Sequence, residues 1–123
     1  MKMIKTFEEI EAWGNARKLS YQIHTLTKNG DFSKDFGLKD QICRAAISIM
    51  SNIAEGYESN SPAVFIRYLN IAKASAGEVR SHLYIALDQS YISPKDFNFL
   101  SDLSRKISSQ LSNFRKHLKS KLC

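Results

Sequence analysis

The sequence predicts an all-α fold, an antiparallel up-down-up-down four-helix bundle that forms one domain over residues 1–123. Three observations predict it. Apolar residues recur at steps of three and four along most of the chain. Only two prolines and five glycines interrupt this pattern, and the main interruptions carry the sequence signatures of helix ends. A chain of 123 residues also has the length of a single domain whose core needs no disulfide or metal.

The first helix is expected over residues 6–28. Thr6 and Glu9 have the three-residue spacing of a capping box, which marks a helix start. Asn29-Gly30-Asp31 is a turn signal that ends the helix. The amphipathic stripe between these two signals consists of Phe7, Ile10, Trp13, Ala16, Leu19, Ile23 and Leu26.

The second helix is expected over residues 37–56, and it is apolar around most of its circumference. Gly56 is expected to close this helix by adopting the left-handed conformation. One polar line interrupts the apolar surface, with successive members separated by 3, 4, 4 and 3 residues. Its members are Gln41, Arg44, Ser48, Asn52 and Glu55.

The third and fourth helices are expected over residues 61–90 and 93–121. Each begins with a Ser-Pro dipeptide, Ser61-Pro62 or Ser93-Pro94, in which serine is the N-cap and proline takes the first helical position. The apolar stripe of the third helix is Phe65, Leu69, Ala72, Ala76, Val79, Leu83 and Ala86, and that of the fourth is Leu100, Leu103, Ile107, Leu111, Phe114 and Leu118. Short connections make sequential helices antiparallel.

The polar line of the second helix has a counterpart on the third. In an antiparallel hairpin that turns near Ser61, residues whose numbers add to about 122 lie at the same height. By this rule Arg44 faces Glu78, Glu55 faces Arg67, Asn52 faces Asn70 and Gln41 faces Ser81. We predict a polar seam that fixes the helix register or forms a subunit contact; the alternative is a solvated stripe whose charges do not meet. The predicted seam consists of Gln41, Arg44, Ser48, Asn52, Glu55, Arg67, Asn70 and Glu78.

The net charge of +6 is concentrated near the end of the chain. Residues 103–123 contain six basic side chains and no acidic one. These basic residues are Arg105, Lys106, Arg115, Lys116, Lys119 and Lys121. We predict that they contact the phosphates of RNA or DNA. The alternative is a solvated helix end whose cations complement the helix dipole.

No catalytic, cofactor-binding or metal-binding site is predicted. Arg17 and His24 fit the loose spacing of HEPN ribonucleases, which makes a ribonuclease the least favoured alternative. Glu78 and His82 lie one turn apart and could share a metal ion, but the chain lacks any Glu-x-x-His motif of a bundle metal site. Nucleophilic catalysis by Cys43 is not expected, because its apolar neighbours leave the thiol inert.

Two cysteines, Cys43 and Cys123, do not form a disulfide framework, so a reduced and cytoplasmic setting is expected. The first residues lack the apolar core and cleavage site of a signal peptide. No apolar run is long enough to cross a bilayer, so no membrane partner is expected.

Several motifs resemble the signature of a family of small bacterial four-helix-bundle proteins, which are often encoded by intervening sequences within 23S rRNA genes. The resemblance extends along nearly the whole chain. It is strongest in the second helix, at Gln41, Arg44-Ala45-Ala46, Ser48-Ile49 and Ser51-Asn52-Ile53-Ala54-Glu55-Gly56. Further matches are Phe7, Ala12-Trp13, Ala16, Phe65, Leu69, Ile71-Ala72, Ser75, Glu78 and Tyr91-Ile92.

The resemblance implies the same bundle assembled as a ring of five subunits. A related branch, the accessory variability protein of diversity-generating retroelements, is a basic pentamer that binds nucleic acid and a reverse transcriptase. We therefore expect a non-enzymatic homo-oligomer, a pentamer, that contacts RNA or DNA and has room for a protein partner. A purely structural protein–protein interaction module is the alternative. Three residues depart from the family pattern: Cys43 replaces a basic residue, and Ala74 and Ser90 replace glycines.

Overall fold

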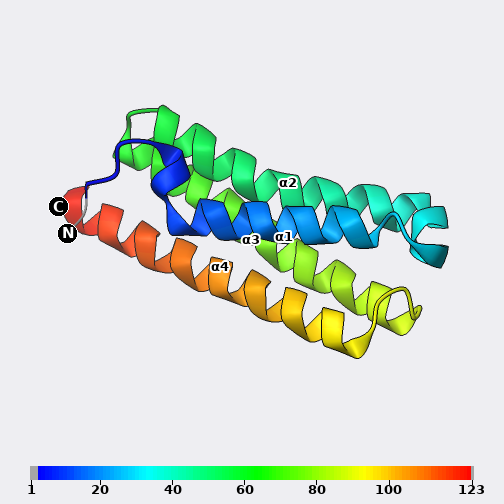
Figure 1. Cartoon of the computed structure of the whole chain (residues 1–123). Coiled ribbons are helices and arrows are strands. Elements are labelled where there is room, and N and C mark those ends of the chain that lie inside the picture. Colours follow the sequence, from blue (N-terminus) through cyan, green and yellow to red (C-terminus); the bar gives the residue numbers. More distant parts are fainter. Residues whose placement is uncertain (1–2, 123) are drawn as a thin grey trace.

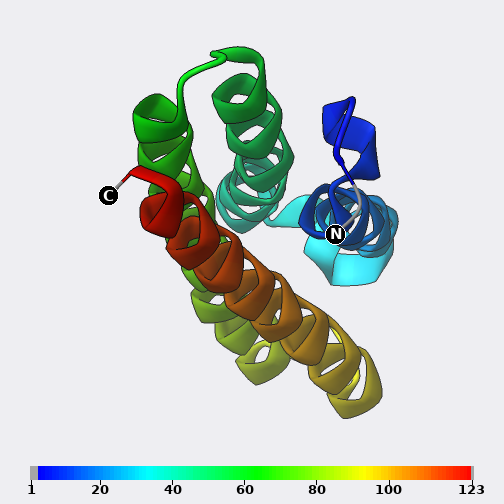
Figure 2. The same ribbon diagram turned by 90° about the vertical axis from the view of Figure 1, so that its left-hand side faces the viewer.

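The computed structural model describes residues 3–122 and contains four α-helices in that range. They are α1 (Glu11–Leu26), α2 (Phe36–Glu58), α3 (Pro62–Asp88) and α4 (Pro94–Leu122), with two short 3-10 helices, η1 (Phe7–Glu9) and η2 (Gly30–Lys34). Figures 1 and 2 show α2 beside α3, α1 against α2, and α4 against α3. The predicted fold class, an antiparallel four-helix bundle, is confirmed.

The first predicted helix is divided in two. Ile10 has an extended backbone (φ −76°, ψ 119°), so the chain turns between η1 and α1. The carboxylate of Glu9 accepts a hydrogen bond from the Thr6 N–H at 3.2 Å, so the predicted capping box starts η1 and not a long helix. The turn lets the Phe7 ring pack edge-on against Trp13, with 5.1 Å between the ring centroids. The predicted turn at Gly30 is present and continues into η2.

The prediction for Gly56 is wrong. Gly56 does not end α2, which continues to Glu58; it is buried inside the helix. A Cβ at Gly56 would lie 2.7 Å from Cδ1 of Phe65 and 2.8 Å from Cβ of Tyr68. The glycine is therefore needed for the close approach of α3, and Asn60 (φ 55°) supplies the left-handed residue of the turn.

The predicted starts of the last two helices agree with the structure. The Ser61 hydroxyl accepts from the Val64 N–H at 3.3 Å at the start of α3. The Ser93 hydroxyl accepts from the Asp96 N–H at 3.0 Å at the start of α4. Both helix starts could be predicted from the sequence, because a serine N-cap depends only on residues within one helical turn.

The end of α3 is a Schellman motif. The Tyr91 N–H donates to the Ala86 carbonyl at 2.8 Å, and the Ser90 N–H donates to the Leu87 carbonyl at 3.0 Å. This arrangement requires a left-handed residue at Ser90, whose φ is 59°. The resemblance noted in the sequence implies glycine at this position, which fits the left-handed backbone found here.

The core lies along the whole length of the bundle and is built from the predicted apolar stripes of all four helices. Its largest fully buried side chains are Phe32, Leu19, Ile23, Ile42, Ile49, Ile53, Leu69, Leu83, Leu100, Ile107, Leu111 and Val79. Phe32 comes from η2, which the sequence had not assigned to the core. No helix within residues 3–122 combines the length and apolar composition that a bilayer crossing needs.

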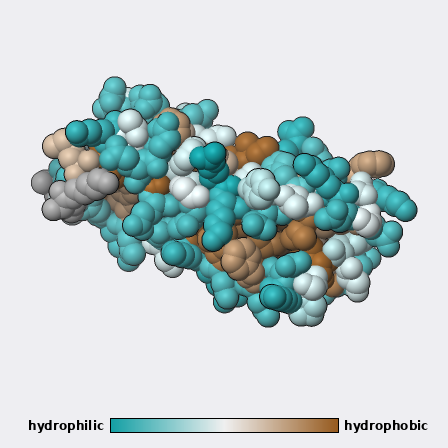
Figure 3. Space-filling view, in the orientation of Figure 1, coloured by the Kyte–Doolittle hydropathy of each residue, from teal (hydrophilic) through white to brown (hydrophobic). Residues whose placement is uncertain are grey.

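The contact between α1 and α4 is partly polar. The Asn15 amide donates to Oε1 of Gln110 at 3.0 Å, and the Gln110 amide donates to Glu11 at 3.2 Å. Figure 3 shows an apolar strip in the region where Figure 1 draws α1 and α4 apart from each other, with α3 visible between them. Phe99 of α4 is 46% exposed, and the Lys18 ammonium of α1 lies 5.5 Å from its ring centroid.

Candidate functional site

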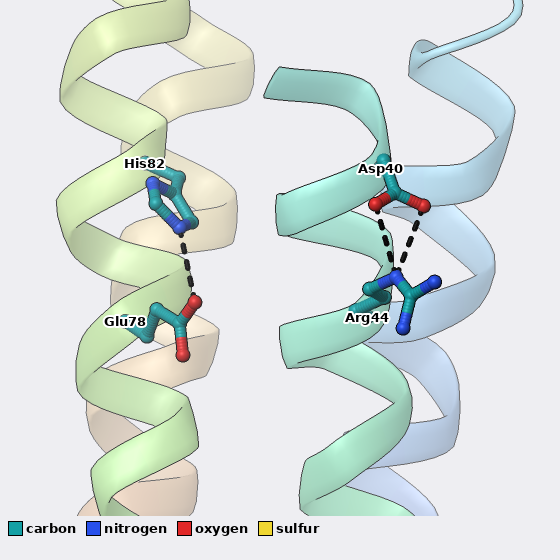
Figure 4. A network of polar contacts seen from close by, with 4 residues as sticks. All are labelled: Asp40, Arg44, Glu78 and His82. Carbon is teal, nitrogen blue, oxygen red and sulfur yellow. Dashed lines mark hydrogen bonds and ion pairs between the residues drawn. The ribbon is translucent and has the colours of Figure 1, made fainter. Parts of the chain in front are cut away.

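The register predicted for α2 and α3 is confirmed. The Ser75 hydroxyl of α3 donates to the Ser48 hydroxyl of α2 at 2.9 Å, and the two residue numbers add to 123. Figure 4 shows Arg44 and Glu78 at similar heights on the two neighbouring helices. The hairpin rule therefore places residues correctly along the helix axes to within about one position.

The predicted ion pairs across the helices are wrong for the single chain. Nε of Arg44 lies 3.0 Å from the Asp40 carboxylate one turn earlier on α2. Nε2 of His82 lies 3.2 Å from the Glu78 carboxylate on α3. The Arg44 and Asp40 side chains are 78% and 63% exposed, so each finds a partner on its own helix with little loss of rotamer freedom. Figure 4 shows both pairs lying along their own helices.

The other predicted seam pairs do not form within residues 3–122 either. Glu55 and Arg67 are exposed, and no ion pair joins them. The Asn52 amide donates to the carbonyl and hydroxyl of Ser48, at 2.8 and 2.9 Å, on its own helix. Asn70 accepts from Arg115 of α4 at 2.7 Å and so faces away from α2. Gln41 is exposed.

The part of the seam that does join the helices is neutral. Asn52 donates to Ser48, which also accepts from Ser75, so three side chains form one chain of hydrogen bonds between α2 and α3. Ser75 is only 8% exposed. Ser75 was not predicted as a seam residue, because residue numbers that add to 122 pair Ser48 with Ala74. The part of the polar line that joins α2 and α3 thus consists of hydroxyl and amide groups and not of charges.

A second stripe of residues runs along the exposed side of α3. Its members are separated by 4, 3, 4, 3 and 4 residues, which is the spacing of a helix–helix seam. They are Arg67, Ile71, Ala74, Glu78, Ser81 and Ile85, and all six are exposed. We call this set the exposed α3 stripe. Ile71 and Ile85 are 45% and 44% exposed, so the stripe presents aliphatic groups to the outside.

The basic residues of α4 fall into two groups. Between positions 103 and 122, five are exposed: Arg105, Lys106, Lys116, Lys119 and Lys121. Arg115 is half-buried, because its Nη1 donates to Oδ1 of Asn70 on α3, and its buried Nε has no hydrogen-bond partner in the part of the chain described. No acidic residue lies between positions 103 and 122 to neutralise this end of the helix.

Two basic residues on the side of α3 that faces α4 were not anticipated. The Ala76 carbonyl accepts from the Ser104 hydroxyl of α4 at 2.9 Å, which shows that this side of α3 faces α4. Lys73 and Arg80 lie three residues before and four residues after Ala76, on the same side of the helix. Both are half-buried. We define the basic face as Lys73, Arg80, Arg105, Arg115, Lys116 and Lys119.

The residues considered for catalysis and metal binding have other contacts. The Arg17 guanidinium lies 5.9 Å from the Trp13 ring centroid, and Nδ1 of His24 lies 2.7 Å from the Ser20 carbonyl of its own helix. Within residues 3–122, no three metal-binding side chains of His, Cys, Asp or Glu gather at one place. Cys43 is half-buried with its sulfur 3.8 Å from the Thr27 hydroxyl, and Cys123 lies outside the described residues.

These features define a small, basic, all-α bundle protein with a chain of neutral hydrogen bonds between α2 and α3. The chain belongs to the 23S rRNA-intervening sequence protein family, whose model matches residues 8–113. The resemblance seen in the sequence motifs is therefore confirmed.

Among solved structures, the chain is similar to a crystal structure from Bacteroides thetaiotaomicron, of a protein with unknown function from the S23 ribosomal protein family. The TM-score is 0.78 with 27% sequence identity, over 85% of this chain and 98% of that chain. No curated protein matches the chain. The residues Arg115, Lys116, Lys119 and Lys121 follow the segment matched by the family model, so inferences about them depend on this chain alone.

Proposed function

We propose that this chain is a non-enzymatic accessory protein that assembles as a homo-oligomer and contacts RNA or DNA through its basic face. The observation that supports the proposal best is the charge of residues 103–122 in α4, where five basic side chains are exposed and no acid is present. Lys73 and Arg80 add positive charge on the neighbouring helix. Such a surface attracts the phosphate backbone of nucleic acids, and assembly into a ring would multiply the charge.

The experiment is fluorescence anisotropy of labelled structured RNA and duplex DNA across a salt series. Each phosphate neutralised on duplex DNA contributes about −0.9 to the slope of log affinity against log salt, so three contacts give a slope of roughly −3. The double variant Arg105→Ala/Lys116→Ala is expected to flatten the slope by about 2. The control Lys28→Ala/Lys34→Ala removes the same charge from the connection between α1 and α2 and is expected to bind as the wild type does.

Two results would contradict the nucleic-acid proposal. One is the absence of binding at low salt, which would leave α4 as a solvated helix end. The other is an equal loss of affinity in both double variants. This would mean that affinity depends on the total charge of the protein and not on the position of the charges in the basic face. Neither result would bear on oligomer assembly, which is measured separately.

The exposed α3 stripe supports the homo-oligomer. Its spacing is that of a surface that packs against another helix, and no helix of residues 3–122 covers it. Family resemblance implies a pentamer, so five copies of the 14.0 kDa chain would give about 70 kDa. Light scattering at micromolar concentration is expected to give this mass for the wild type and a lower mass for Ile71→Asp.

The control for assembly is Tyr21→Asp, because Tyr21 is 70% exposed on α1, away from the stripe. This variant should keep the mass of the wild type. A wild-type mass of 14.0 kDa would contradict the homo-oligomer.

A structural protein–protein interaction module is the second candidate function. The exposed α3 stripe favours it, because the same aliphatic surface fits a helix of a different protein. A monomeric chain that binds no nucleic acid would favour this module. The ribonuclease alternative is tested with the same RNA: cleavage that disappears in His24→Ala would replace the accessory proposal, whereas intact RNA after long incubation would exclude it.

A further inference from the structure

An apolar groove of about 790 Å³ lies at the end of the bundle, where the α2–α3 turn meets the last turns of α4. Three aromatic rings form a row inside it. Tyr57 and Phe65 meet edge-on with 6.1 Å between centroids, and Phe65 meets Phe114 in the same way at 5.1 Å. Ile4 and Leu118 add aliphatic side chains to the lining. Neither the basic face nor the exposed α3 stripe includes any of these residues.

The groove is held open by contacts that do not depend on a ligand. The Tyr57 hydroxyl donates to the Ile4 carbonyl at 3.1 Å, which fixes the segment before η1 as one side of the groove. The edge-on ring contacts restrict the aromatic side chains, and Gly56 keeps Phe65 close to α2. A volume of this size is within the range of small-molecule sites, about 300–1,000 Å³.

The charge around the groove is positive. Lys121 lines it, together with His117 one turn earlier on α4. No acidic side chain lines the groove within the described part of the chain. The remaining polar groups lie in the α2–α3 turn, at Asn60 and Ser61, and at Asn113 on α4. An occupant therefore meets an apolar interior and one cation.

We propose that this groove binds an amphiphilic anion: an alkyl chain that lies on the aromatic row, with a carboxylate at Lys121. The apolar lining favours an occupant without internal polar groups, since burying unpaired amides is unfavourable. An extended peptide would bring N–H and C=O groups that the few polar side chains here could not satisfy. The proposal does not require nucleic-acid binding or assembly, although Lys121 is also one of the five exposed basic residues between positions 103 and 122.

Isothermal titration calorimetry with hexanoate, octanoate and decanoate tests the alkyl-chain part. Each added methylene buried in the groove is expected to strengthen binding about two- to fourfold. An affinity that does not change with chain length, or no binding of decanoate up to its solubility limit, would overturn the proposal.

The charge part is tested with Lys121→Glu. This variant is expected to lose about tenfold in affinity for decanoate and to bind 1-decanol as the wild type does, because only decanoate carries a charge. The control Lys106→Glu changes the same charge 15 residues earlier on α4, about 22 Å away and beyond the screening length. Equal losses in both variants would contradict a carboxylate at Lys121.

The location is tested with Asn113→Trp. Asn113 is exposed at the groove, so a larger side chain there obstructs the groove without entering the core. This variant should lose decanoate binding while its unfolding midpoint stays near that of the wild type. In methyl NMR spectra of the wild type, decanoate should shift the signals of Ile4 and Leu118 and leave that of Ile49 in the core unchanged. Undiminished binding by Asn113→Trp would place the ligand elsewhere and overturn the proposal.

Discussion

Gly56 shows how the absence of one side chain sets the distance between two helices. The glycine faces Phe65 and Tyr68 of α3. A Cβ at this position would lie too close to both residues unless the helices moved apart. From the sequence alone, the same glycine near the end of an apolar run indicates a helix end. The sequence of α2 alone could not indicate the close approach, because that role of Gly56 depends on its contact with α3.

Gly56→Ala is expected to lower the free energy of unfolding by about 1–3 kcal/mol, because the added methyl forces α2 and α3 apart. The matched control is Gly77→Ala in α3, where a Cβ meets no atom within 4 Å. There the gain in helix propensity should raise the free energy of unfolding by about 0.5–1 kcal/mol. Urea unfolding followed by circular dichroism measures both. Stabilisation by Gly56→Ala would mean that the close approach has no role.

At the scale of the element, the sequence was sufficient for the helix starts and for the register, but not for the partners of exposed charges. Ser61 and Ser93 cap their helices through bonds within one turn, so they could be recognised locally. The heights of Arg44 and Glu78 follow from the antiparallel hairpin. Their partners do not, because an exposed side chain chooses between a residue on its own helix and one across the groove by small differences in rotamer entropy.

The basic face was predicted only in part for a related reason. The six basic residues between positions 103 and 123 stand out in the sequence because no acid interrupts them. Lys73 and Arg80 are single basic residues on a different helix, and only the Ser104–Ala76 hydrogen bond shows that their side of α3 faces α4. The attachment of Arg115 to Asn70 also depends on how α3 and α4 pack, which no local spacing reveals.

The end of α3 offers a test of the left-handed position. Ser90 has a left-handed backbone, with φ 59°, which glycine adopts more easily than serine does. For most residues the strain of this conformation lowers the free energy of unfolding by about 1 kcal/mol. Ser90→Gly is therefore expected to raise the free energy of unfolding by about 0.5–1 kcal/mol. Asn60→Gly, at φ 55°, should gain less because asparagine tolerates this region better. Urea midpoints compare the two, and a larger gain at Asn60 would contradict this account of the α3 end.

At the scale of the whole molecule, one cluster joins both connections at the end of the bundle that is opposite η1 (Figure 1). The Asp35 carboxylate accepts from the Leu38 N–H at 3.1 Å, which caps α2, and from the Tyr91 hydroxyl at 2.9 Å. The Tyr91 ring also stacks on Phe32 of η2 with 5.1 Å between centroids. The connection from α1 to α2 is thereby attached to the connection from α3 to α4, and these segments are far apart in the sequence.

This cluster predicts a specific loss of stability at alkaline pH. The hydrogen bond to the Asp35 carboxylate, with burial and the charges of Asp35 and Asp31, raises the pKa of the Tyr91 phenol above its ordinary value of 10.0. The protonated phenol is thus favoured in the folded state. Its contribution is fully present below pH 10.0 and disappears as the pH rises through the higher pKa of the folded protein.

Tyr91→Phe should therefore be less stable than the wild type at neutral pH, and the difference should shrink as the pH rises above the ordinary pKa of tyrosine, 10.0. Urea unfolding at a series of pH values from about 8 to about 11 measures this difference. Comparison with the wild type cancels the titration of lysines and other tyrosines, which both chains share. Tyr21→Phe is the control, because Tyr21 is 70% exposed on α1, far from this cluster in the chain. Equal stability of Tyr91→Phe and the wild type at every pH would mean that Tyr91 contributes through ring packing on Phe32 alone, because phenylalanine keeps the ring, and the hydrogen bond to Asp35 would then have no part in holding the two connections together. A difference that stays constant as the pH rises would contradict the pH dependence expected from the phenol.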